Sequence, residues 1–140
     1  MRPKALLACA ALAIAFGAEL RARDPTDHTE VDSKQILIEA LAADPSKQVN
    51  AQLYTFPPGV ILPWHIHPDA DEIAYVLEGD FAFQIEGGQE RALKPGEATY
   101  LAPNLVHRGM NKGKTPVKLF VVRIKPEDKP LVQEVPAPQP

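Results

Sequence analysis

The sequence has almost no cysteine, no basic excess and no helical pattern of apolar residues. Its one cysteine, Cys9, lies near the N-terminus, so the remainder of the chain can form neither a disulfide nor a reactive thiolate. The formal net charge of −3 argues against a nucleic-acid-binding protein, which would normally present a basic face. A glycine-rich phosphate-binding loop and a serine triad are also missing from the sequence.

Proline, in contrast, is abundant. The chain holds 15 prolines in 140 residues, about twice the usual share of ~5%. Proline lacks the backbone N–H and its ring clashes with the preceding helical turn, so this composition excludes a helix bundle. The length leaves room for a single domain with one hydrophobic core.

An apolar run occupies residues 5–16, behind a positively charged start. Twelve residues are too few to span a bilayer as a helix. The small residues Ala15 and Gly17 then stand at the positions expected before a cleavage site. This layout predicts a signal peptide over residues 1–17, cut after Gly17, rather than a buried helix or a lipoprotein signal at Cys9. We therefore expect a periplasmic or secreted protein that is free of the membrane once the signal is removed.

The body of the chain, residues 35–125, alternates short apolar runs with turn residues. Residues 81–85 show the period-two alternation of a half-buried strand. Glycine at 87–88 and Pro-Gly at 95–96 mark tight turns. Short strands at close spacing predict an all-β fold, an antiparallel sandwich or barrel. Residues 35–43 are the one stretch that could also form a short helix.

Two flanking segments are poor in apolar residues. A polar leader covers residues 18–34, and we expect it to be loose. A proline-rich tail covers residues 126–140, and we expect it to be either disordered or extended as an edge strand along the body. The predicted organisation is thus one domain between two irregular ends.

Three histidines and a glutamate in the body form the candidate site. His65 and His67 are two residues apart in a predicted strand, so their side chains point to the same side. Glu72 opens the next predicted strand, and His107 lies on a later strand that a barrel would close against the first. Three neutral imidazoles and one carboxylate suit a divalent first-row metal. Such a site would leave positions open for water, substrate or dioxygen.

The spacing of these residues resembles the two sequence motifs of the cupin superfamily, and the chain looks like a small, single-domain, exported cupin of the cupin_2 type. Two positions of the second motif depart from the family pattern, because Ala102 stands in place of proline and Asn104 in place of glycine. Asparagine tolerates a positive φ better than other non-glycine residues, so we expect the turn at Asn104 to survive. The matching residues are Gly59, His65, His67, Glu72 and Gly79 in the first motif, and Gly96, His107 and Asn111 in the second.

The resemblance implies a conical jelly-roll β-barrel with a metal ion inside. His65, His67, Glu72 and His107 would be the ligands, and Glu72 could also leave the metal and act as a catalytic base. The ion would be Mn, Fe, Ni, Zn, Co or Cu, because affinity alone does not select among them. The resemblance also implies a homodimer formed through sheet edges and a small-molecule ligand or substrate.

Two classes of function remain open at this point. The first is a metal-dependent enzyme, dioxygenase-like or of isomerase or lyase type, that acts on a small oxygen-bearing metabolite. The second is a non-catalytic accessory or sensor protein that holds a metal or a ligand. A deep cavity beside an open metal site would favour catalysis, whereas a filled barrel with a saturated ion would favour storage or structure.

Overall fold

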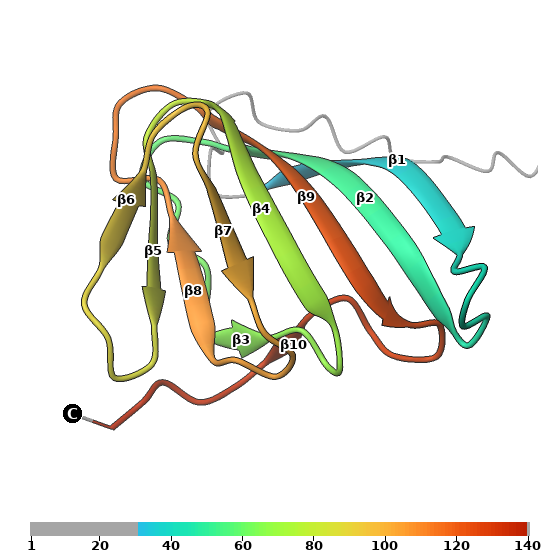
Figure 1. Ribbon diagram of the computed structural model, residues 1–140. Helices are drawn as coiled ribbons and strands as arrows, with labels where there is room; N and C mark the ends of the chain where they lie inside the picture. Colours follow the sequence, from blue (N-terminus) through green and yellow to red (C-terminus); the bar gives the residue numbers. More distant parts are fainter. Residues whose placement is uncertain (1–30, 140) are drawn as a thin grey trace, which may run out of the picture.

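The computed structural model describes residues 31–139, which form ten β-strands and no helix (Figure 1). The predicted all-β class is therefore confirmed, and the alternative of a short helix over residues 35–43 is wrong. Within the described residues, no helix is long and apolar enough to cross a membrane. The strands are β1 (Asp32–Ala40), β2 (Lys47–Phe56), β3 (His65–Ile66), β4 (Asp71–Glu78), β5 (Phe81–Ile85), β6 (Arg91–Leu93), β7 (Ala98–Leu101), β8 (His107–Met110), β9 (Val117–Pro126) and β10 (Gln133–Glu134).

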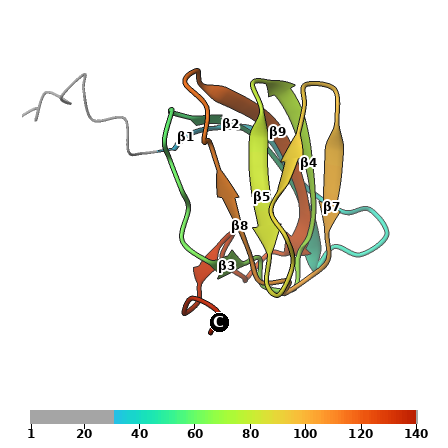
Figure 2. The ribbon, with the colours of Figure 1, turned by 90° about the vertical axis from the view of Figure 1, so that its left-hand side faces the viewer.

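The ten strands build two five-stranded sheets that face each other. The first sheet has the order β1-β2-β9-β4-β7, and the second has the order β10-β3-β8-β5-β6. Every strand pairing is antiparallel. Figure 2 views the molecule from the side of the second sheet, with β5 and β8 in front of β4 and β9. The path from sheet to sheet is that of a jelly roll.

The core lies between the sheets because the strands alternate in polarity. Along β9 the buried positions Val117, Leu119 and Val121 alternate with more exposed ones. They pack with Phe81 and Phe83 of β5, among others, in one buried apolar cluster. The two phenylalanines thus link the two sheets.

Two of the backbone positions with positive φ bear on the motif residues. Asn104 has φ of 62°, so the predicted turn at this position is confirmed. Gly79 has φ of 75°, and a side chain there would also approach the Pro116 carbonyl oxygen to 2.8 Å. Both residues stand in the motifs on which the family resemblance depends.

The observed strands extend beyond the expected boundaries of the body. β1 begins at Asp32 rather than at residue 35, because Asp32 already pairs with Thr55 of β2. At the other end β9 continues to Pro126, and the tail contributes the short strand β10. The predicted signal peptide, its cleavage site at Gly17 and most of the leader lie outside the described residues.

Candidate metal centre

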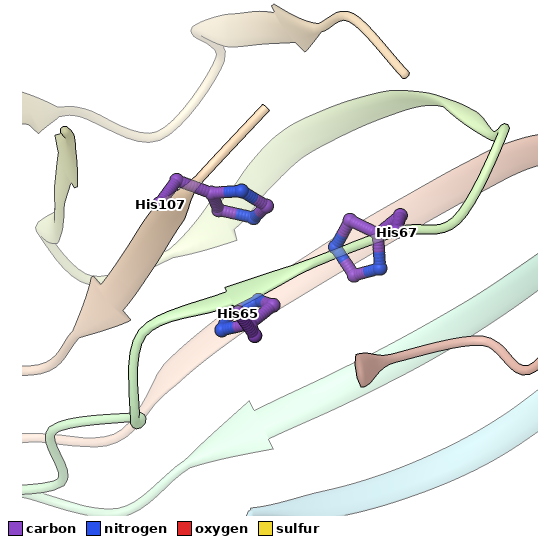
Figure 3. Close-up of side chains that lie close together, drawn as sticks. All are labelled: His65, His67 and His107. Atoms are coloured by element: carbon purple, nitrogen blue, oxygen red, sulfur yellow. The ribbon is translucent and has the colours of Figure 1, made fainter. Parts of the chain in front are cut away.

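The three histidines of the body meet on the inner side of the second sheet. His65 on β3 and His107 on β8 are cross-strand partners, and His67 follows two residues after His65. The ring centroids lie 4.4 Å apart for His65 and His107, 5.2 Å for His65 and His67, and 5.0 Å for His67 and His107. One nitrogen from each ring lies within 4.8 Å of the others, and Figure 3 shows the rings gathered around a common space. All three side chains are buried.

Each of the three rings is held by the main chain through its Nδ1 atom. A carbonyl oxygen can only accept, so Nδ1 must carry the proton in every case. In a neutral ring this leaves Nε2 with a free lone pair, which is the form that binds a metal ion. The acceptors are the carbonyl oxygens of Pro63 for His65 (2.8 Å), Leu131 for His67 (2.6 Å) and Leu105 for His107 (2.8 Å).

Burial keeps two of these imidazoles neutral. It lowers the pKa of His65 to about 4, and it also lowers the pKa of His107. At neutral pH both rings are therefore already in the neutral form that binds a metal ion, and neither has to lose a proton first. The donor chemistry of the cluster fits a divalent first-row transition metal.

Glu72, the fourth predicted ligand, lies beside the cluster at the start of β4. Its Oε2 atom is 2.9 Å from Nε2 of His67, and the same atom accepts a hydrogen bond of 2.6 Å from Nε of Arg123. Burial would raise the pKa of Glu72, but the contact with His67 and the charge of Arg123 lower it to about 2. A carboxylate and an imidazole lone pair would repel at 2.9 Å. The contact therefore requires either a proton on Nε2 of His67 or a cation shared by both atoms.

Arg123 on β9 is a site residue that the sequence reasoning missed. Besides Glu72, its guanidinium donates to Gln52 (3.1 Å) and to the hydroxyl of Tyr54 (2.9 Å), both on β2. The signal was present, because Arg123 continues the buried alternation of Val117 and its successors. A charged residue at a strand position that points into the core normally has a partner of opposite charge.

A pair of loop residues ties the two motifs together. The backbone N–H of Asp69 donates to Oδ1 of Asn104 (3.1 Å), and Nδ2 of Asn104 donates to Oδ1 of Asp69 (2.9 Å). Both residues have positive φ, 52° and 62° respectively. In addition, the N–H of Asn104 donates to the carbonyl oxygen of His67. The asparagine that replaces the expected glycine therefore also links the loop after His67 to the loop before His107.

The three histidines line a cavity of about 220 Å³ between the sheets. Glu72 and Arg123 line the same cavity, beside His67. The remainder of the wall is mainly apolar, so a ligand could place oxygen atoms at the histidines and an apolar body against the wall. The apolar wall includes Phe56, Leu62, Phe81, Phe83, Leu101, Leu119 and Val121.

The stability of the metal-free protein is expected to fall as the pH is lowered from about 6.5 to about 2. His65 has an ordinary pKa of 6.5 and a folded value of about 4, so within that interval only the unfolded chain takes up the proton. Glu72 repeats the effect between 4.5 and about 2. Urea unfolding of the chelator-treated protein across this range would measure it. His65→Gln should reduce the upper part of the decline, to which His107 also contributes because burial lowers its pKa as well, and a midpoint that rises on acidification would contradict the assignment.

The chain is similar to known proteins of one family. The family description "Cupin domain" matches residues 52–123. Germin-like protein 1 of Brassica napus is 37% identical over 75 residues, which are 51% of this chain and 36% of that protein. The chain thus spans about a third of the length of the plant relatives it matches.

Two solved structures show the same fold. An oxalate oxidase in complex with glycolate has a TM-score of 0.59 at 24% identity, over 81% of this chain and 59% of its own. The DMSP lyase DddQ from Ruegeria pomeroyi has a TM-score of 0.59 at 21% identity, over 75% and 51%. At these identities the likeness concerns the fold. With the family match over half of its length, a jelly-roll architecture and three histidines positioned to bind a metal ion, the chain belongs to the cupin family.

Proposed function

We propose that the protein is a metal-dependent enzyme, dioxygenase-like or of isomerase or lyase type, that acts on a small oxygen-bearing metabolite. The observation that carries the proposal is the arrangement of His65, His67 and His107. All three hold Nδ1 in main-chain hydrogen bonds, which leaves Nε2 as the donor atom, and all three line one cavity. An enzyme site needs both a reactive centre and an enclosed space for substrate, and this cavity offers both.

The three histidines would hold the ion, and Glu72 is the proposed fourth ligand and proton acceptor. A divalent transition metal, when bound, supplies Lewis acidity to substrate oxygens. The Glu72 carboxylate is ionised at neutral pH and so can receive a proton from a bound substrate. Arg123 holds that carboxylate in place at 2.6 Å. The apolar wall seats the body of the substrate and excludes water.

Elemental analysis followed by an activity screen tests the proposal. We expect about one divalent transition metal per chain, and turnover of a diol, enediol or hydroxy acid that stops on metal removal and returns on its addition. Metal binding without turnover on any such compound, together with a raised melting temperature for one of them, would favour the non-catalytic binding protein. No metal and no shift in melting temperature with any metal would contradict both functions.

The protein is further proposed to form a homodimer, through a face of the first sheet rather than through the sheet edges that the family resemblance implied. A row of uncharged side chains crosses all five strands of the first sheet on the face opposite to Glu72 and Arg123. Leu37, Ile73 and Tyr100 in this row are each at least 43% exposed. Exposed apolar side chains gathered on one face of a sheet mark an interaction surface, and we infer that two copies meet here, with Asp71, which accepts a hydrogen bond from Tyr100, beside the contact. The row consists of Leu37, Ala51, Val122, Ile73 and Tyr100.

Light scattering after size-exclusion chromatography would measure the dimer. We expect the molar mass of two chains for the unmodified protein and of one chain for Ile73→Lys, which sets a charge within the row. Gln89→Lys adds the same charge at an exposed position near the β5–β6 turn and should leave the dimer intact. A monomeric unmodified protein would contradict this proposal.

A small molecule rather than a nucleic acid is the proposed ligand, in keeping with the net charge of −3.

Export of the protein is also proposed. It is supported by the charged start, the apolar run and the small residues of the first 17 positions. Mass spectrometry of the protein recovered from outside the cytoplasm should find Ala18 as its first residue.

A further inference from the structure

The C-terminal segment returns to the metal centre after β9 has ended. Residues 131–135, here called the strap, run beside β3, and Figure 1 shows this red segment next to β3 at the β10 label. Within the strap, Gln133 pairs with Ile66 and Glu134 with His65. The N–H of Val135 then donates to the carbonyl oxygen of Trp64 (2.9 Å). The strap is thus the outermost strand of the second sheet and lies directly against a histidine of the cluster.

The strap supplies a contact that the rest of the chain does not supply. His65 and His107 donate to carbonyl oxygens only two residues before them, so their own strands orient them. His67 donates instead to Leu131, which is 64 residues away in sequence. The main-chain acceptor that orients His67 therefore comes from the strap, whereas Glu72 contacts the other nitrogen of the ring.

The strap also forms part of the cavity wall. Val132 and Glu134 both line the same cavity as the histidines. The remaining attachment is slight, because β10 has two residues and the strap lies between Pro130 and Pro136, neither of which can donate a backbone hydrogen bond. Segments held by so few hydrogen bonds open locally at low free-energy cost.

We propose that the strap is a positioning element of the metal centre: it orients His67 through the Leu131 carbonyl and closes one side of the cavity. This inference rests on the proposed metal site. If the strap leaves, His67 loses the acceptor that directs Nε2 toward the other two rings, and the cavity opens beside β3. Loss of such an outer partner of a ligand typically lowers metal affinity by about 10- to 100-fold.

Two truncations separate the strap from the end of the tail. A chain that ends at Pro130 lacks the whole strap, whereas a chain that ends at Val135 keeps it and loses only the last five residues. We expect the Zn²⁺ affinity, measured by chelator competition, to fall about 10- to 100-fold in the first and to match the full chain in the second. Equal affinity in all three proteins would overturn the inference.

A matched pair of substitutions tests the same point in the full chain, should the shorter truncation not fold. Val135→Pro removes the N–H that donates to Trp64, and Val135→Ala keeps it. Only the proline variant is expected to weaken Zn²⁺ binding. In metal-free protein it should also expose Trp64, the single tryptophan, to acrylamide quenching and shift the imidazole ¹⁵N resonances of His67 but not those of His107.

The metal-free measurements keep the two proposals distinguishable. If the full chain binds no metal, the proposed function fails, and the Trp64 and His67 signals still decide whether the strap orients His67. If the full chain binds Zn²⁺ but Val135→Pro matches Val135→Ala in affinity, quenching and ¹⁵N shifts, the strap inference fails and the metal site stands.

Discussion

Replacing His107 by alanine is expected to lower the affinity for divalent transition metals by more than about 100-fold, beyond the range typical for loss of an outer partner of a ligand. The reason is the number of donors. His107 supplies one of three nitrogens that lie within 4.8 Å of one another, and its removal leaves two histidines that stand two residues apart, His65 on β3 and His67 just after it. Two imidazoles and a carboxylate already engaged by Arg123 hold an ion much less firmly than the full set.

The neighbouring residue provides the matched control for this experiment. Arg108 is on the same strand, but its guanidinium donates to Gln84 and stacks over the ring of Trp64 at 4.7 Å, away from the cluster. Arg108→Ala should therefore bind Zn²⁺ as tightly as the unmodified protein in chelator competition. Circular dichroism of both metal-free variants would establish that they are folded. Unchanged affinity in a folded His107→Ala protein would refute the three-histidine site.

The second large effect concerns stability rather than metal binding. Arg123→Met is expected to reduce the free energy of unfolding of the metal-free protein by about 3–5 kcal/mol. Methionine keeps much of the volume of the side chain but leaves the ionised Glu72 buried without its cationic partner. The hydroxyl of Tyr54 and the amide of Gln52 lose a donor in the same change.

An exposed ion pair on the same strand serves as the comparison for Arg123→Met. Nζ of Lys118 lies 2.9 Å from Oε1 of Glu78, and both side chains are largely exposed. Lys118→Met should cost only about 0–1 kcal/mol, because water screens such pairs. Adding Glu72→Gln to Arg123→Met should restore much of the lost stability, since the uncompensated charge is then absent. Similar urea midpoints for Arg123→Met and Lys118→Met would contradict a buried ion pair.

Much of the fold and the histidine cluster could be predicted because the relevant signals are local. Alternation within a strand puts His65 and His67 on one side, and the turn at Asn104 follows from the conformations that asparagine tolerates. Two glycines with positive φ mark strand boundaries in the same way: Gly79 directly follows the end of β4, and Gly96 lies shortly before the start of β7. Side-chain alternation and turn positions depend on a few neighbouring residues. They can therefore be predicted without knowing how the strands pair.

The contacts that were missed join segments far apart in the chain. The pairing of Glu72 with Arg123 spans 51 residues and depends on the register of β4 against β9. The bond from His67 to Leu131 spans 64 residues and ends on a carbonyl oxygen. Every residue has such an oxygen, so no side-chain pattern marks the one that is used. The tail was expected to lie along the body as one of two options, but its contact with a candidate ligand had no signal in the sequence.

The main-chain acceptors behind the three imidazoles have a consequence for how this site can diverge among related chains. Pro63, Leu105 and Leu131 contribute only backbone oxygens to the rings, so their side chains can drift without loss of the ring orientation. The local spacing, in contrast, is fixed: an insertion or deletion between Pro63 and His65, or between Leu105 and His107, would turn the imidazole away, and for His67 the register of β10 against β3 must be kept. Comparison of distant homologues should therefore weigh gaps near these three positions more heavily than exchanges at them.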